Sequence, residues 1–316
     1  QFVMRGGHVL WLLDGVRASM DSMHKETQSF LTGGLDLNLE DILFTYGVRI
    51  NANLIEDMDC NPIPVVVGMV GDKPQTELRS WLYFPVLMPS SKHPIVNNLD
   101  PVMTMFASSM DTIANPDIKK TVLLASSKYS RVAPHPARVS LSMMAYKPDS
   151  RLFNKPYQPV AVLLEGKFRS VFNNRLEPGF LKVLKDSLKM PFRAHSDTPT
   201  SMIVISDGDL LDNDYSERQG TLPMGYWRFT QNNFANKTFF LNCLEYLTDR
   251  SGLLESRSKE VKLRLLDSGR VKSEKAKWQW INILVPTGLM LVFASVYLFF
   301  RKRRYEKQAS SEKEKK

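Results

Sequence analysis

The stretch MIVISDGDLLDN, residues 202–213, decides the fold. Its first five residues are apolar or small, and such a run that meets Asp-Gly predicts a buried strand followed by a sharp turn. The carboxylates of Asp207 and Asp209 are therefore expected just past the carboxyl end of the strand. Ligands bind at this edge in open α/β sheets, but Asp also stabilises turns, so the stretch predicts either a ligand site or a turn.

The spacing of the acidic residues also has some features of a calcium-binding loop. An EF-hand loop has glycine at its sixth position and glutamate at its twelfth. Counted from Asp207, however, the glycine is second and Arg218 is twelfth. We therefore expect no metal site and no cofactor here.

The same alternation of strands and helices continues outward from this stretch. A second apolar run, residues 8–13, ends at Asp14, and residues 39–46 have helical spacing closed by Gly47. Further strands are expected within residues 61–70, 81–88, 121–125, 160–164 and 261–265, of which the last is expected to be a half-buried edge strand. Asn236 is expected to cap a helix. The apolar stripe of that helix would consist of Phe239, Phe240, Cys243, Leu244 and Leu247. Strands that alternate with helices and end at acidic residues predict an α/β fold with a doubly wound, mostly parallel sheet.

The body of the protein is predicted to span residues 1–258, with polar, proline-bearing insertions near 126–159 and 170–199. Gln1 is not an initiator, and QFVMRGG is typical of the last turn of a helix with its glycine cap. We therefore expect the natural protein to have a further amino-terminal part. Residues 259–280 are predicted to hold the closing strand and a juxtamembrane linker.

An uncharged apolar run, residues 281–300, is long enough to cross a bilayer as a helix. Aromatic residues at one end and basic residues at the other are typical of interface anchors, and the basic end favours the cytoplasmic side. These predicted anchors are Trp278, Trp280, Arg301, Lys302, Arg303 and Arg304. Residues 301–316 then form a basic cytoplasmic tail, with membrane lipid as its partner.

The net charge of +9 is confined to the carboxy-terminal part. From residue 259 onward there are 15 Lys and Arg against 6 Asp and Glu, which leaves residues 1–258 balanced at 27 of each. The high isoelectric point is therefore no argument for nucleic-acid binding. Two cysteines, Cys60 and Cys243, form no metal-binding pattern; they could pair outside the cytoplasm, although Cys243 reads as a small core residue.

Hydrolase chemistry on such a sheet requires a nucleophile on a tight strand-to-helix turn. The nearest match is LLASSKYSR, residues 123–131, in which Ser126 and Ser127 follow a strand without a neighbouring glycine. These serines, with Tyr129 and Arg131, could instead form a cradle for an anion or a polar ligand. A structural alternative, in which the serines cap the loop and Arg131 is solvated or paired with an acidic residue, also fits the pattern.

Seven segments together give the chain a family resemblance. They are QFVMRGGHVLWLLDGV, LNLEDILFTYGVRIN, HPIVNNLDP, LLASSKYSRV, PVAVLLEGKF, MIVISDGDLLDN and NKTFFLNCLEYLTDRSGLLESRSKEVKLRLLD. In their order, and with the terminal span, they resemble the GldG family of gliding-motility-associated ABC transporter auxiliary proteins of the Bacteroidetes. A more distant resemblance is to amidotransferase-like α/β domains that have lost their catalytic residues.

The GldG resemblance implies a protein of the inner membrane whose body is periplasmic and whose carboxyl terminus is cytoplasmic. It also implies a permease and an ATP-binding subunit as partners, and it carries over no catalytic residue. The leading hypothesis is a non-enzymatic auxiliary or substrate-binding subunit with candidate ligand residues Asp14, Ser126, Ser127, Tyr129, Arg131, Asp207 and Asp209. The alternatives are an extracytoplasmic serine hydrolase and a structural scaffold of the gliding machinery.

Overall fold

The structure is a computed structural model, and it describes residues 1–146, 148–217, 220–249 and 268–313, with side chains in the last segment from 275 to 303. The chain divides into two units, Gln1–Lys259 and Glu260–Lys316. The strand predicted at residues 261–265 lies outside the described residues.

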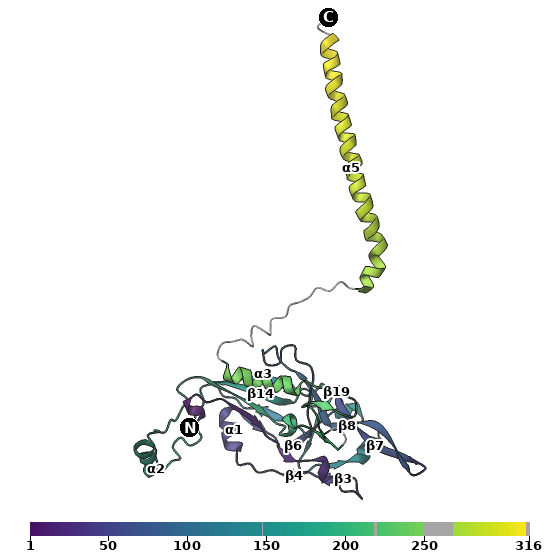
Figure 1. Ribbon diagram of the computed structural model, residues 1–316. Coiled ribbons are helices and arrows are strands. Elements are labelled where there is room, and N and C mark those ends of the chain that lie inside the picture. Colours follow the sequence, from purple (N-terminus) through teal and green to yellow (C-terminus); the bar gives the residue numbers. More distant parts are fainter. Residues whose placement is uncertain (147, 218–219, 250–267, 314–316) are drawn as a thin grey trace. The chain divides into compact units, whose positions relative to one another are not determined.

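The body is built around one mixed sheet (Figure 1). Its strands lie in the order β1 (Val9–Leu12), β15 (Thr200–Ile205), β14 (Pro159–Gly166), β11 (Ile118–Ala125), β8 (Lys73–Pro89) and β7 (Cys60–Val70), with β9 (Val102–Met103) paired to β8. Of these pairs, only β1 with β15 is parallel. The α/β class and the predicted strands that lie within the described residues are confirmed. The sheet is mixed, so the prediction of a mostly parallel sheet is wrong, and a doubly wound fold is not confirmed.

Both faces of the central strands are buried. In β15, Met202 and Val204 face one apolar core, while Ile203 and Ile205 face the other, as the two-residue period of a strand requires. Helix α1 (Glu40–Tyr46) contributes Leu43 and Tyr46 to the first core, and helix α3 (Asn236–Thr248) packs on the second. Figure 1 shows these two helices on opposite sides of the sheet.

The two predicted helices begin and end close to the expected residues, but the role of Asn236 differs. Helix α1 ends at Gly47, which has the left-handed φ of +100° that glycine adopts without strain. Asn236 is not an N-cap: its side chain is buried and bonds the backbone of Met103 and the carbonyl oxygen of Leu210. It therefore fastens α3 to the loops at one edge of the sheet.

The buried stripe of α3 is narrower than predicted. Phe239, Cys243 and Leu247 are buried, whereas Leu244 is exposed. Cys243 is thus a core residue, as expected. It and the half-buried Cys60 are both free thiols, so they form no disulfide bridge.

A third apolar core packs on strands β7 and β8 of the sheet and is rich in aromatic residues. Its largest buried members are Phe30, Trp81, Tyr83, Phe84, Phe106 and Trp227. Short two-stranded pairs surround it: β2 (Val16–Arg17) with β4 (Gly33–Gly34), β3 (Ser29–Leu31) with β13 (Arg138–Ser140), β6 (Asn53–Asp57) with β12 (Ser130–Pro134), and β18 (Tyr226–Trp227) with β19 (Asn232–Asn233). The segment predicted as an insertion at 126–159 therefore contributes β12 and β13 to the body.

The remaining described elements are short. Strand β5 (Val48–Ile50) pairs with β10 (Met110–Thr112), and β16 (Tyr215–Ser216) pairs with β17 (Gly220–Thr221). The predicted insertion at 170–199 holds α2 (Pro178–Lys182) and a π-helical turn, η5 (Val183–Ser187). Single 3-10 turns are η1 (Val3–Arg5), η2 (Met20–Ser22), η3 (Leu141–Ala145), η4 (Ser150–Leu152) and η6 (Asp209–Leu211).

The second unit contains one long helix, α5 (Ser268–Lys313). Its segment Lys275–Arg303 is long and apolar enough to cross a membrane, and it includes the predicted span at residues 281–300. Trp278 and Trp280 are exposed at one end of that span, as interface anchors would be. At the other end the guanidinium carbon of Arg303 lies 4.7 Å from the centre of the Phe299 ring.

Candidate functional site

The two parallel strands end in the same dipeptide. Strand β1 is followed by Leu13 and then Asp14-Gly15, and strand β15 is followed by Ser206 and then Asp207-Gly208. Because β1 and β15 are parallel neighbours, their carboxyl ends meet at one edge of the sheet. The backbone N–H of Gly208 donates a 2.7 Å hydrogen bond to the carboxylate of Asp14. The two predicted acidic positions are therefore in contact.

Gly208 is required here by space rather than by backbone conformation. Its φ of −71° suits any residue. A Cβ atom at this position, however, would lie 2.9 Å from the Oδ2 atom of Asp14. Glycine thus allows the two loop backbones to approach closely enough for the hydrogen bond.

Asp207 stabilises the turn. It is fully buried, and its carboxylate accepts backbone N–H bonds of 2.9 Å from Met105 and from Asp209. The second of these bonds closes an Asx turn. Burial raises the pKa of Asp207 well above its ordinary value, and nearby Asp14 and Asp209 add to that effect. If Asp207 stabilises a turn, its carboxylate should accept backbone N–H bonds, and it does so.

Asp209 behaves differently from Asp207. Among the described residues, its partly buried carboxylate has no hydrogen-bond or salt-bridge partner. Burial raises its pKa to about 6, and the charges of Asp14 and Asp212 contribute. Burial likewise raises the pKa of Asp14, against the opposing effect of the bond from Gly208. Asp209 therefore carries a carboxylate that the turn does not use.

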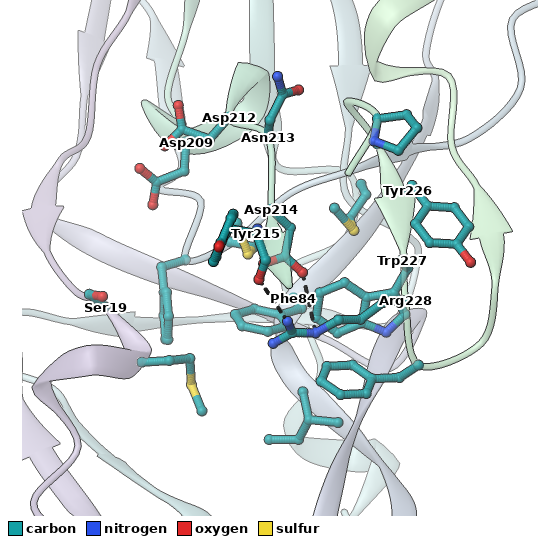
Figure 2. A pocket seen from close by; sticks show the side chains of 18 of the residues that line it. Ser19, Phe84, Asp209, Asp212, Asn213, Asp214, Tyr215, Tyr226, Trp227 and Arg228 are labelled. Atoms are coloured by element: carbon teal, nitrogen blue, oxygen red, sulfur yellow. Dashed lines mark hydrogen bonds and ion pairs between the residues drawn. The ribbon is translucent and has the colours of Figure 1, made fainter. Parts of the chain in front are cut away.

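A pocket of about 460 Å³ lies beside this acidic turn. Its size falls in the range of small-molecule sites, roughly 300–1,000 Å³. The residues that line it come from η2 and the residue before it, from β7, β8, β9 and the loop after β9, and from the chain after β15: Ser19, Met20, Asp21, Ile63, Pro64, Phe84, Met103, Met105, Phe106, Asp209, Asp212, Asn213, Asp214, Tyr215, Pro223, Gly225, Tyr226, Trp227, Arg228 and Phe229. Figure 2 shows Asp209 and Asp212 on one side of it, with Tyr226 and Trp227 on the other.

Aromatic rings form the apolar part of this pocket. Trp227 packs edge-to-face against Phe84, with ring centres 5.6 Å apart, and against Phe229 at 5.1 Å. Phe84 in turn packs against Phe106 at 5.3 Å. The indole N–H of Trp227 donates to the carbonyl oxygen of Pro62 at 2.8 Å, which fixes the orientation of the ring. The rings are held rigidly because each is packed against another.

One basic side chain, Arg228, lines the pocket. Its Nε atom is 3.3 Å from the carboxylate of Asp214, and its guanidinium donates to the carbonyl oxygen of Tyr215 at 3.0 Å (Figure 2). Its guanidinium carbon also lies 4.9 Å from the centre of the Phe229 ring. Arg228 is thus engaged by the pocket itself and neutralises Asp214.

The second group of predicted residues follows β11, at the same edge of the sheet but two strands away from β15. The Ser127 hydroxyl donates to the buried carboxylate of Asp57 at 2.6 Å, and the Ser127 backbone N–H donates to it at 2.7 Å. The Ser126 hydroxyl is 2.7 Å from that of Ser130 and accepts the backbone N–H of Gln158. Both serines are buried and fully used by the loop.

Arg131 is paired within the protein. Its guanidinium makes two hydrogen bonds, of 2.9 and 2.6 Å, to the buried carboxylate of Glu56, which also accepts the Tyr83 hydroxyl at 3.2 Å. The ring of Phe153 lies 5.0 Å from the guanidinium carbon. Tyr129 is about half exposed, at 43%. This arrangement matches the structural alternative in which Arg131 is paired with an acidic residue.

No histidine is a hydrogen-bond partner of Ser126 or Ser127 among the described residues. His8, for comparison, bonds Ser201 at the opposite end of β15. Within the part of the chain that the structure describes, no three His, Cys, Asp or Glu side chains converge as metal ligands would.

Sequence reasoning found Asp14, Asp207 and Asp209 but missed the aromatic pocket. The segment GYWRF, residues 225–229, places three aromatic residues and one arginine in succession, and this was the available signal. Phe84, which packs against Trp227, lies in the apolar run at residues 81–88, and that run was interpreted only as a strand.

Residues 1–243 match a family model for auxiliary components of ABC transporters, which is described as an ABC-type uncharacterized transport system. No curated protein and no solved structure matches the chain.

Proposed function

We propose that this chain, which belongs to the family of auxiliary components of ABC-type transport systems, is a non-enzymatic, substrate-binding subunit of a transporter that serves gliding motility. The membrane helix and the family fit association with a membrane. The gliding role rests on the resemblance of seven segments of the sequence to GldG-type proteins.

The observation that carries the substrate-binding role is the pocket beside the acidic turn. Part of its wall, Asp209 and Asp212, belongs to the chain that directly follows the carboxyl end of β15. The pocket combines an aromatic lining with carboxylates, such as those of Asp209 and Asp212, that have no salt-bridge partner among the described residues. Such a combination of apolar walls and a few polar groups is typical of a small-molecule site.

The non-enzymatic role is supported by the state of the candidate nucleophiles. Ser126 and Ser127 are buried, and among the described residues neither is hydrogen-bonded to a histidine; the Ser127 hydroxyl instead donates to the buried carboxylate of Asp57. Within the part of the chain that the structure describes, no assembled serine–histidine pair therefore supports the alternative of a serine hydrolase.

A periplasmic body and a cytoplasmic carboxyl terminus are supported by the charges around the span. Four basic residues, 301–304, follow it directly, and Trp278 and Trp280 precede it. Basic residues next to a span favour its cytoplasmic end.

Affinity purification of the full chain from native membranes tests the proposal. A permease and an ATP-binding subunit should co-purify with it in mild detergent, and the basal ATPase rate of that complex should be measurable. Recovery of gliding-machinery components without either transporter subunit would contradict the proposal and favour a scaffold.

A further inference from the structure

The pocket beside the acidic turn has a strong excess of negative charge. It is lined by Asp21, Asp209, Asp212 and Asp214 against the single cation of Arg228. Arg228 neutralises Asp214. Among the described residues, no salt bridge involves any of the other three carboxylates. The charge of Asp212 acts against that of Asp209, and an occupant with a positive charge would relieve this repulsion.

The lining also matches the chemistry of an organic cation. Cations bind over the faces of tryptophan, tyrosine and phenylalanine within about 6 Å of the ring centre. Arg228 already makes this contact with Phe229, together with a carboxylate and a carbonyl oxygen. The pocket thus holds one guanidinium through an aromatic ring, a carboxylate and a carbonyl oxygen. Aromatic rings and carboxylates also line the rest of the pocket.

A metal ion fits the pocket less well than an organic cation. The carboxylates do not converge as a set of metal ligands among the described residues. The cavity of about 460 Å³ is far larger than a metal ion, and much of its wall is aromatic. The size of the cavity and its aromatic wall suit an occupant that has an apolar body next to its charge.

We propose that this pocket binds a small organic cation, an amine or guanidinium group on an apolar body, with Asp209 and Asp212 facing the charge and the rings of Trp227 and Phe84 bordering the apolar part. The inference rests on the proposed function, since it names the class of substrate for the same site. It adds a charge and a shape that the family match does not specify.

Calorimetric titration of the full chain in nonionic detergent tests this inference. The probes are phenethylamine and phenylguanidine as cations, phenethyl alcohol as a neutral analogue and hydrocinnamate as an anion. Both cations should bind at millimolar concentration, more tightly than the alcohol, and the anion should not bind. The double variant Asp209→Asn/Asp212→Asn should weaken cation binding by about tenfold or more, because it removes two nearby charges.

The matched control is Asp72→Asn, which removes an exposed carboxylate from the turn between β7 and β8. It should leave cation binding unchanged. The inference is overturned if neither cation binds, if the alcohol binds as tightly as the amine, or if the double variant binds the cations as the wild type does.

Co-purification separates this inference from the proposed function. The double variant should still recover the permease and the ATP-binding subunit, since its substitutions lie in the pocket. Absence of both partners from the wild type contradicts the transporter role, whatever the titration gives. Recovery of both partners without cation selectivity contradicts only the substrate class.

Discussion

Replacing Asp209 by Asn should stabilise the folded body at neutral pH. The pKa of Asp209 is raised from 3.8 to about 6, first by burial and then by the charges of Asp14 and Asp212. The folded state therefore binds a proton that the unfolded state has already released between about pH 4 and pH 6. Stability must fall as the pH rises through this window, and the cost is fully present above about pH 6.

The magnitude follows from the separation of the two pKa values. Each pH unit between them is worth about 1.4 kcal/mol, which gives an upper limit of about 3 kcal/mol. The side chain is only partly buried, so solvent screening reduces this figure to about 1–2 kcal/mol. Asparagine has nearly the shape of the acid and no charge. Below about pH 4 the variant and the wild type should therefore be similar in stability.

Urea unfolding of the full chain in nonionic detergent, followed by tryptophan fluorescence from pH 4 to pH 7.5, measures the effect. The Asp72→Asn variant controls for the loss of one surface charge. If Asp209→Asn is less stable than the wild type by more than about 1 kcal/mol at neutral pH, its carboxylate stabilises the turn after all. A difference that does not change with pH would also refute the reasoning.

Three further predictions test the structural interpretation. Ser127→Ala should lower the free energy of unfolding by about 1.5–3 kcal/mol, measured by urea unfolding, because the buried carboxylate of Asp57 loses a hydroxyl donor; transporter function should fall only as far as folded protein does. Gly208→Ala should cost about 1–2 kcal/mol because its methyl group displaces the Asp14 carboxylate, whereas Gly179→Ala, which meets no atom within 4 Å, should be neutral or stabilising in thermal melts. Protease added to spheroplasts should digest the body and spare a carboxy-terminal tag, and loss of the tag would reverse the topology.

The strands could be predicted from sequence, but their directions could not. A central strand that is buried on both faces is apolar throughout, whether its neighbours are parallel or antiparallel. Strand β14 is such a strand, and it lies antiparallel between β15 and β11. The Gly71-Asp72 pair between two strand-like runs was a hairpin signal, and β7 and β8 indeed form an antiparallel pair across it. That signal points away from a uniformly parallel sheet.

Asp14, Asp207 and Asp209 could be predicted as a group because they follow strand-like runs, and of these three Asp209 lines the pocket. The aromatic part could not, since its residues lie far apart in the sequence: Phe84 in β8, Phe106 in a loop after β9, and Trp227 in β18. Their proximity depends on the third core, which forms only when the short strand pairs close around it. The helical or strand periodicity of a short stretch of sequence does not predict a contact between residues so far apart in the chain.

Asp207 and Asp209 are two residues apart, yet the structure gives them opposite roles. The turn uses the carboxylate of Asp207, which accepts two backbone N–H groups, so hydrogen bonds offset part of the cost of its burial. The carboxylate of Asp209 has no such bond among the described residues, and it lies next to two other acidic side chains at a cost in stability. A turn alone would be at least as stable with asparagine at this position. A carboxylate that destabilises the free protein but borders a pocket is more readily explained by a bound cation, whose charge would lower the pKa of Asp209 and recover that cost on binding.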